Sequence, residues 1–81
     1  MHDDKVACPR CGQDWLIYVR LIHLDRHAIF CPECEALWHT AADVGVTPFE
    51  EYQTFMIRNG RANPNNKDEI EFGAPLMQAP N

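Results

Sequence analysis

Four cysteines are the residues of this chain best suited to chemistry, and they occur in two copies of one pattern. Residues 8–15 and 31–38 each read Cys-Pro-x-Cys, then three residues, then Trp, and the 81-residue chain has no other cysteine. Two residues between paired cysteines let a tight turn aim both sulfurs at one point, and four thiolates match tetrahedral Zn²⁺. The spacing therefore predicts one structural Zn²⁺ held by Cys8, Cys11, Cys31 and Cys34.

Two other chemistries use similar cysteine pairs. A redox dithiol would place one pair in a strand–helix–strand unit, whereas here the pair is duplicated outside any such unit. An iron site of rubredoxin type uses four cysteines as well, and sequence alone does not choose the metal. Zinc remains the prediction because a small chain with paired cysteines and no leader favours a structural metal over disulfides.

Both motifs resemble the knuckles of the zinc-ribbon superfamily, and the resemblance covers about residues 6–38. In these knuckles the residue after the second cysteine is often a glycine with positive φ. Gly12 fits this position, and Pro9 and Pro32 fit theirs. Glu35 occupies the equivalent position in the second motif, which predicts either backbone strain or a different turn there.

Acidic residues are concentrated in the middle of the chain. The formal net charge is −5, and residues 31–57 contain no Lys or Arg. Binding to phosphate backbones requires clustered Lys and Arg, so this composition argues against nucleic acid and favours a basic protein partner. The plainer reading is that the acids keep a small domain soluble. The partner-binding residues predicted on this basis are Glu33, Glu35, Asp43, Glu50 and Glu51.

Residues 15–22 form the clearest predicted strand, because β-branched and aromatic residues dominate it. A turn at residues 23–27 and a return strand at residues 28–30 complete a β-hairpin with one knuckle at each root. Further short strands are expected at residues 38–40 and, as an edge strand, at residues 70–72. Both faces of the first strand are mostly apolar, so both faces need to be covered.

Residues 48–58 form the one predicted helix. Thr47 and Glu50 have the spacing of a capping box, and Pro48 suits the first helical position. Gly60 suits the position that ends a helix. The apolar stripe that should pack on the hairpin consists of Phe49, Tyr52, Phe55 and Met56.

Together these elements predict a small metal-stabilised α+β fold, a zinc-ribbon β-hairpin with one C-terminal amphipathic helix. A chain of this length suffices for a single domain, assigned to residues 1–73, and residues 74–81 are predicted to be a flexible tail. A short chain buries little apolar surface, so a stabilising metal is expected. The polar start and the absence of a long apolar run predict a cytoplasmic protein without a membrane segment.

Other side chains with chemical potential have simpler explanations. Trp15 and Trp38 are expected to lie in the core beside the metal rather than to stack on bases. His23 and His27 are expected to be solvated at the hairpin tip, and His39 is not needed as a ligand beside four cysteines. No nucleophile–base pair, phosphate loop or open metal position is recognisable, so we predict that the chain is not an enzyme.

Three function classes follow from these observations. The first is a protein-binding module that resembles an acidic inhibitor of the immunity or antitoxin type, for which a basic nuclease toxin is a natural partner; this comparison rests on size and charge. The second is a nucleic-acid-associated zinc ribbon, which a basic face would favour. The third is a rubredoxin-like electron carrier, which would be coloured. The acidic middle of the chain favours the first class.

Overall fold

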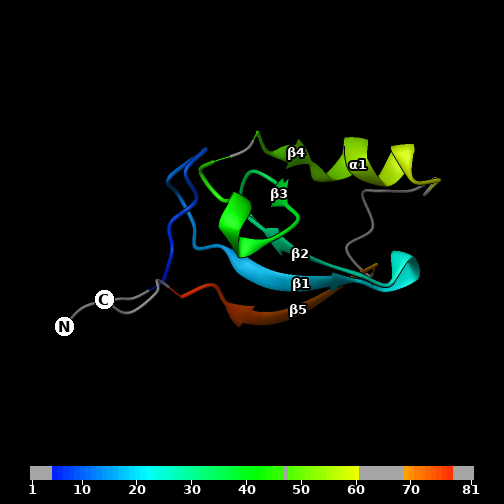
Figure 1. Ribbon diagram of the computed structural model, residues 1–81, viewed down its shortest axis with the longest axis horizontal. Helices are drawn as coiled ribbons and strands as arrows, with labels where there is room; N and C mark the ends of the chain where they lie inside the picture. The colour runs from blue at the N-terminus through cyan, green and yellow to red at the C-terminus, as the bar shows by residue number, and fades with distance from the viewer. Residues whose placement is uncertain (1–4, 47, 61–68, 78–81) are drawn as a thin grey trace.

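Five antiparallel strands form one sheet in the computed structural model, which describes residues 5–46, 48–60 and 69–77. The strands lie in the order β4-β3-β2-β1-β5, so the β1–β2 hairpin is central, and one short helix, α1, runs along one side of the sheet (Figure 1). The elements are β1 (Ile17–Leu21), η1 (Ile22–Leu24), β2 (Arg26–Phe30), β3 (Ala36–Trp38), η2 (Ala41–Asp43), β4 (Glu50–Glu51), α1 (Tyr52–Arg58) and β5 (Ile70–Pro75).

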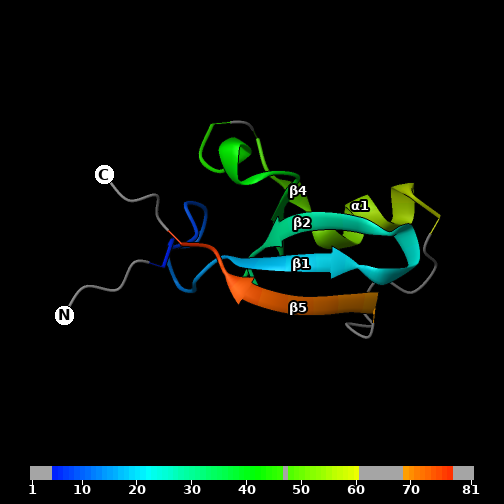
Figure 2. The same cartoon turned by 60° about the horizontal axis from the view of Figure 1, so that its bottom comes forward.

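This architecture corrects the predicted fold class. We expected an α+β arrangement of a hairpin and a C-terminal helix, whereas the described residues form mainly a five-stranded antiparallel sheet. The single α-helix has seven residues, and strand β5 follows it in the chain. The prediction failed because two short strands, β4 and β5, extend the sheet at its two edges (Figure 2).

The central hairpin forms where the sequence predicted it. Strands β1 and β2 pair from Ile17 with Phe30 to Leu21 with Arg26. The turn is the 3₁₀ segment η1, closed by Asp25 in the left-handed conformation with φ 51°, which short polar side chains tolerate better than most residues. The two knuckles thus lie at the same end of the hairpin, before β1 and after β2.

The side chains of the sheet alternate between two apolar clusters. One cluster, here the helix-side cluster, is covered by α1, and the other, the thiol-side cluster, contains two of the cysteines. Neighbouring residues on one strand, such as Leu37 and Trp38, belong to different clusters, because successive side chains point to opposite faces. The helix-side cluster consists of Val19, Leu21, Ala28, Phe30, Leu37, Tyr52, Phe55, Met56 and Ile70. The thiol-side cluster consists of Cys8, Leu16, Ile29, Cys31, Ala36, Trp38 and Leu76.

Helix α1 packs on the hairpin as predicted, but it begins later. Tyr52, Phe55 and Met56 are buried in the helix-side cluster. Glu50 and Glu51 instead form β4, which pairs with Leu37 and Ala36 of β3. The expected capping box is therefore wrong: the residue before the helix has extended backbone and no side-chain cap. Thr47 lies outside the described residues.

Strand β5 lies at an edge of the sheet, where the sequence predicted a shorter strand. It pairs with β1 and continues through Pro75. Leu76 is buried and joins the N-terminal segment, since Leu76 N donates to Leu16 O and Val6 N donates to Leu76 O. The boundary predicted after residue 73 thus falls inside a strand, and residues 78–81 lie outside the described part of the chain.

Candidate metal centre

The four cysteine sulfurs converge on one point at the knuckle end of the hairpin. All four Sγ atoms lie within 4.8 Å of one another. The Sγ atoms of Cys8 and Cys34 are 3.7 Å apart, and so are those of Cys11 and Cys31. A tetrahedral zinc site with Zn–S bonds of about 2.3 Å has sulfurs about 3.8 Å apart, whereas a disulfide needs about 2.05 Å. The described geometry is therefore that of four free thiols around a metal-sized space.

Each knuckle is a tight turn closed by backbone hydrogen bonds. In the first knuckle, Gly12 N donates to Cys8 O at 2.9 Å, and Cys8 N donates to Asp14 O at 2.9 Å. In the second knuckle, the bond from Glu35 N to Cys31 O, at 2.8 Å, is equivalent to the first of these, and Cys31 N donates to Ala36 O at 3.0 Å. These backbone hydrogen bonds shape the turns that aim the sulfurs at one point.

The residue after the second cysteine has the same left-handed backbone in both knuckles. Gly12 has φ 65° and Glu35 has φ 63°. Of the two alternatives that the sequence left open for Glu35, strain and a different turn, the geometry supports strain. A left-handed residue with a side chain costs about 1 kcal/mol relative to glycine.

The protein environment shifts the thiol pKa values in opposite directions. Burial raises the pKa of Cys31 and of Cys34. A hydrogen bond from Gln13 N to Sγ, 3.4 Å long, lowers the pKa of Cys11. Metal binding has to displace the thiol protons, so the affinity of the site for a metal rises with pH.

Arg10 links the first knuckle to the second, and the sequence analysis missed this role. Its guanidinium donates to Cys34 O at 3.3 Å and pairs with the Glu51 carboxylate at 3.4 Å. It also stacks on Phe49, with 4.3 Å from Cζ to the ring centroid. Nothing in the local sequence marks Arg10, because its partners lie 24 and 41 residues away.

The two tryptophans occupy different environments, although they hold the same position in the repeated motif. Trp38 is 3% exposed and lies in the thiol-side cluster. Trp15 is 39% exposed, so its predicted place in the core is wrong. Cys8 and Cys31 are buried, whereas Cys11 and Cys34 are half-buried. The second cysteine of each knuckle is thus closer to solvent than the first.

Four of the five predicted partner-binding acids lie on adjacent segments of the chain. Glu33 and Glu35 lie on the second knuckle, and β4, with Glu50 and Glu51, pairs with the strand that follows it. Asp43 lies on η2, where its carboxylate accepts a hydrogen bond from Thr40. Glu50 and Glu51 point to opposite faces of the sheet because they are neighbours on one strand: Glu50 meets His39 and Arg58, and Glu51 meets Arg10. We call Glu33, Glu35 and Glu51 the acidic surface.

Several of these carboxylates already have partners within the protein. Glu50 accepts hydrogen bonds from His39 and Arg58, and Gln53 Nε2 lies 3.4 Å from Glu35 Oε1. Burial alone would raise the pKa of Glu50, but the hydrogen bonds from Arg58 and His39 hold it below its ordinary value. Glu33 is exposed on the knuckle.

The histidines with described positions lie outside the sulfur group. His23 Nδ1 is 3.1 Å from Glu69 Oε1, His27 is exposed, and His39 binds Glu50. Among the described residues, the four cysteines are the one group of His, Cys, Asp and Glu side chains gathered closely enough to hold a metal.

The chain matches no protein-family model, no curated protein and no solved structure. The metal site is therefore assigned from its own geometry and donors, which suit a thiolate-binding metal. Both zinc and iron take four-cysteine sites. None of the helices in the described ranges has the length and apolar character needed to cross a membrane.

Proposed function

We propose that the metal is one structural Zn²⁺ and that the chain is a non-enzymatic protein-binding module. Two features support zinc: the 3.7 Å sulfur separations and the resemblance of both knuckles to those of zinc ribbons. Four thiolates complete a tetrahedral shell and leave no position for a substrate. In this proposal the metal stabilises the fold, and binding occurs on the protein surface.

The observation that carries the binding proposal is the acidic surface beside the second knuckle. Ala36, directly after that knuckle, pairs with Glu51, so the three acids lie on adjacent segments. A zinc ion with four thiolates carries two negative charges, which adds to the local field. We propose that a basic protein docks here and that the chain acts as an inhibitor of the immunity or antitoxin type.

Glu35 adds to this argument through its backbone conformation. A glycine would relieve the left-handed strain that Glu35 carries at φ 63°. A strained residue is retained when its side chain serves a purpose, and a carboxylate on the acidic surface is such a purpose.

Affinity purification from the native cell, followed by mass spectrometry, identifies the partner. The test of the surface is the double charge reversal Glu33→Lys with Glu35→Lys in the zinc-loaded protein. We expect it to weaken binding by at least tenfold and to slow association, because complementary charge mainly speeds encounter. Raising salt to about 0.5 M should have a similar effect, since this roughly halves the physiological screening length.

The matched control is Asp25→Lys with Glu71→Lys. These two substitutions change the net charge of the protein by the same amount as the Glu33 and Glu35 reversal. They lie away from the second knuckle, at the β1–β2 turn and on β5, where both acids pair with Arg20. Binding that is unchanged both by the Glu33 and Glu35 charge reversal and by salt at about 0.5 M would show that the acidic surface is not the interface. Nucleic acid retained by the purified protein at that salt would favour the nucleic-acid class instead.

A further inference from the structure

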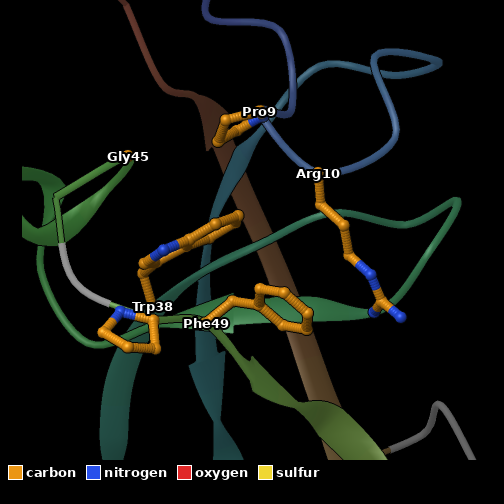
Figure 3. Close-up of a pocket in the computed structure, with 6 residues that line it drawn as sticks. Pro9, Arg10, Trp38, Gly45 and Phe49 are labelled. Carbon is orange, nitrogen blue, oxygen red and sulfur yellow. The ribbon is translucent and has the colours of Figure 1, made fainter.

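A small pocket lies beside the first knuckle, next to the acidic surface. Its volume is about 210 Å³, and its walls are mostly apolar (Figure 3). Pockets for whole small-molecule ligands measure roughly 300–1,000 Å³, so this pocket suits a single side chain better than a complete ligand. The lining residues are Pro9, Arg10, Trp38, Gly45, Pro48 and Phe49.

The wall of the pocket contains a polar atom without a partner. Trp38 is 3% exposed, and within the described part of the chain its Nε1 has no hydrogen-bond acceptor. A buried donor left unpaired is costly, and proteins rarely keep one without a reason. Figure 3 shows Nε1 on the side of the indole toward Gly45. Because this nitrogen is buried, an occupant of the pocket meets the indole ring rather than Nε1 itself.

The rim of the pocket connects it to the acidic surface. Phe49 forms one wall with its ring 6.2 Å from that of Trp38, and Arg10 stacks on the same ring and pairs with Glu51. An apolar anchor placed in the pocket would therefore lie directly beside Glu51. Interfaces of this kind concentrate their binding energy in one buried anchor surrounded by polar contacts.

We propose that this pocket receives one apolar side chain of a basic protein segment. The Lys or Arg residues that flank this side chain lie over the acidic surface. This inference rests on the proposed function and adds an anchor to it. The occupant is a protein segment because the volume fits one side chain. The segment is basic because the one charged residue of the lining, Arg10, already pairs with Glu51, and the neighbouring acidic surface is complementary to Lys and Arg.

The experiment uses three blocked pentapeptides added to the zinc-loaded, ¹⁵N-labelled protein. The first has a leucine between two pairs of basic residues, the second has serine in place of leucine, and the third has the leucine between acidic residues. The chain has two tryptophans, so two indole N–H signals report on Trp38 and on the exposed Trp15. The basic leucine peptide should bind at least tenfold more tightly than the serine peptide, as expected for burying a leucine side chain. It should shift the Trp38 signal and leave the Trp15 signal in place.

Two aromatic truncations provide matched variants. Phe49→Ala removes a wall of the pocket, and Phe72→Ala removes a comparably exposed ring on β5, away from the pocket. Phe49→Ala should abolish the tenfold preference for leucine over serine, and Phe72→Ala should preserve it. Phe49 is 37% exposed and belongs to neither apolar cluster, so the variant is expected to fold.

The outcomes separate this inference from the proposed function. Equal affinity for the two basic peptides, with both affinities lowered by Glu33→Lys and Glu35→Lys, would contradict the apolar anchor in the pocket. It would still support a basic partner at the acidic surface. Tighter binding of the acidic leucine peptide would overturn both. A shift of the Trp38 signal by free leucine amide, with no response to any peptide, would show a small-molecule pocket and also overturn the inference.

Discussion

The two apolar clusters lie on opposite faces of one sheet and are closed in different ways. On one face, Tyr52, Phe55 and Met56 of α1 cover the hairpin with ordinary packing. On the other face, Cys8 and Cys31 are buried at the centre of the cluster, and their sulfurs belong to the metal centre. No helix in the described part of the chain covers this face, and in our proposal a metal ion stabilises the thiol side instead.

The two clusters are also coupled through one backbone hydrogen bond. Helix α1 has no side-chain cap, and its first N–H, that of Tyr52, donates to Glu35 O at 3.0 Å. Glu35 belongs to the second knuckle, so the metal site positions the start of the helix. Loss of the metal should therefore affect the helix-side cluster as well, and because such coupling is reciprocal, damage to the helix should weaken metal binding.

Cys31→Ser is the change with the largest expected effect. Structural zinc contributes roughly 10–16 kcal/mol of apparent folding free energy at neutral pH, which matches or exceeds the whole stability of a small domain. The variant should be unfolded or molten, as should the native chain after metal removal by a chelator. Circular dichroism and amide hydrogen exchange measure this loss. A native-like spectrum after complete metal removal would show that the thiol-side cluster is stable without a metal.

Phe55→Ala tests the helix-side cluster. Phe55 is 3% exposed, and truncation of a buried phenylalanine typically costs 3–5 kcal/mol. The variant should have a lower denaturation midpoint and a weaker apparent metal affinity, because metal binding is coupled to folding. Ile57→Ala, at a 62% exposed position of the same helix, is the control and should change stability and metal affinity little. An unchanged metal affinity in Phe55→Ala would show that the helix-side cluster is not coupled to the metal centre.

Glu50→Gln tests the contact that joins β4 to the end of α1. Arg58 and His39 hold the pKa of Glu50 below its ordinary value of 4.5, so its charge stabilises the fold. This stabilisation, about 0.5–1.5 kcal/mol, is complete above pH 4.5 and is lost as the pH falls through the lower folded-state pKa. Urea denaturation at neutral pH should show native protein more stable than the variant, and the difference should narrow in acid. A difference in unfolding free energy that stays constant with pH would show that the charge of Glu50 is not its cause.

The smallest expected effects come from substitutions at Gly12 and Glu35, the left-handed positions of the two knuckles. Glu35→Gly should stabilise the protein by about 1 kcal/mol, and Gly12→Ala should destabilise it by a similar amount. Glu35→Ala removes the carboxylate but keeps the strain, so it separates the two contributions. Thermal denaturation of the three zinc-loaded variants measures these differences. A loss of stability in Glu35→Gly would indicate that the carboxylate contributes more than the strain costs.

Local patterns predicted the convergence of the four cysteines and the central hairpin correctly. The spacing of the cysteine pairs fixes where the sulfurs can converge, and the β-branched run around Val19 identifies β1 without reference to any distant residue. Of the predicted apolar stripe, Tyr52, Phe55 and Met56 form the buried face of α1. Phe49 precedes the helix and packs on Trp38 instead, so its predicted place in the stripe is wrong.

The errors concern contacts between distant segments. Glu50 has the sequence signature of a helix cap, but pairing with Leu37 draws it into a strand. Trp15 and Trp38 have identical local patterns, and only the packing of Ile29 and Leu76 around Trp38 distinguishes them. Arg10 gains its role from partners that no short motif reveals.

The most direct test of the central claim is elemental analysis of the purified, folded protein, combined with a count of reactive thiols. We predict one equivalent of zinc per chain and no rapidly reacting thiol among Cys8, Cys11, Cys31 and Cys34. One equivalent of iron and a visible absorption band would support a four-cysteine metal site but favour a rubredoxin-like electron carrier as the function. Less than half an equivalent of any metal, with four reactive thiols in a folded chain, would contradict the account.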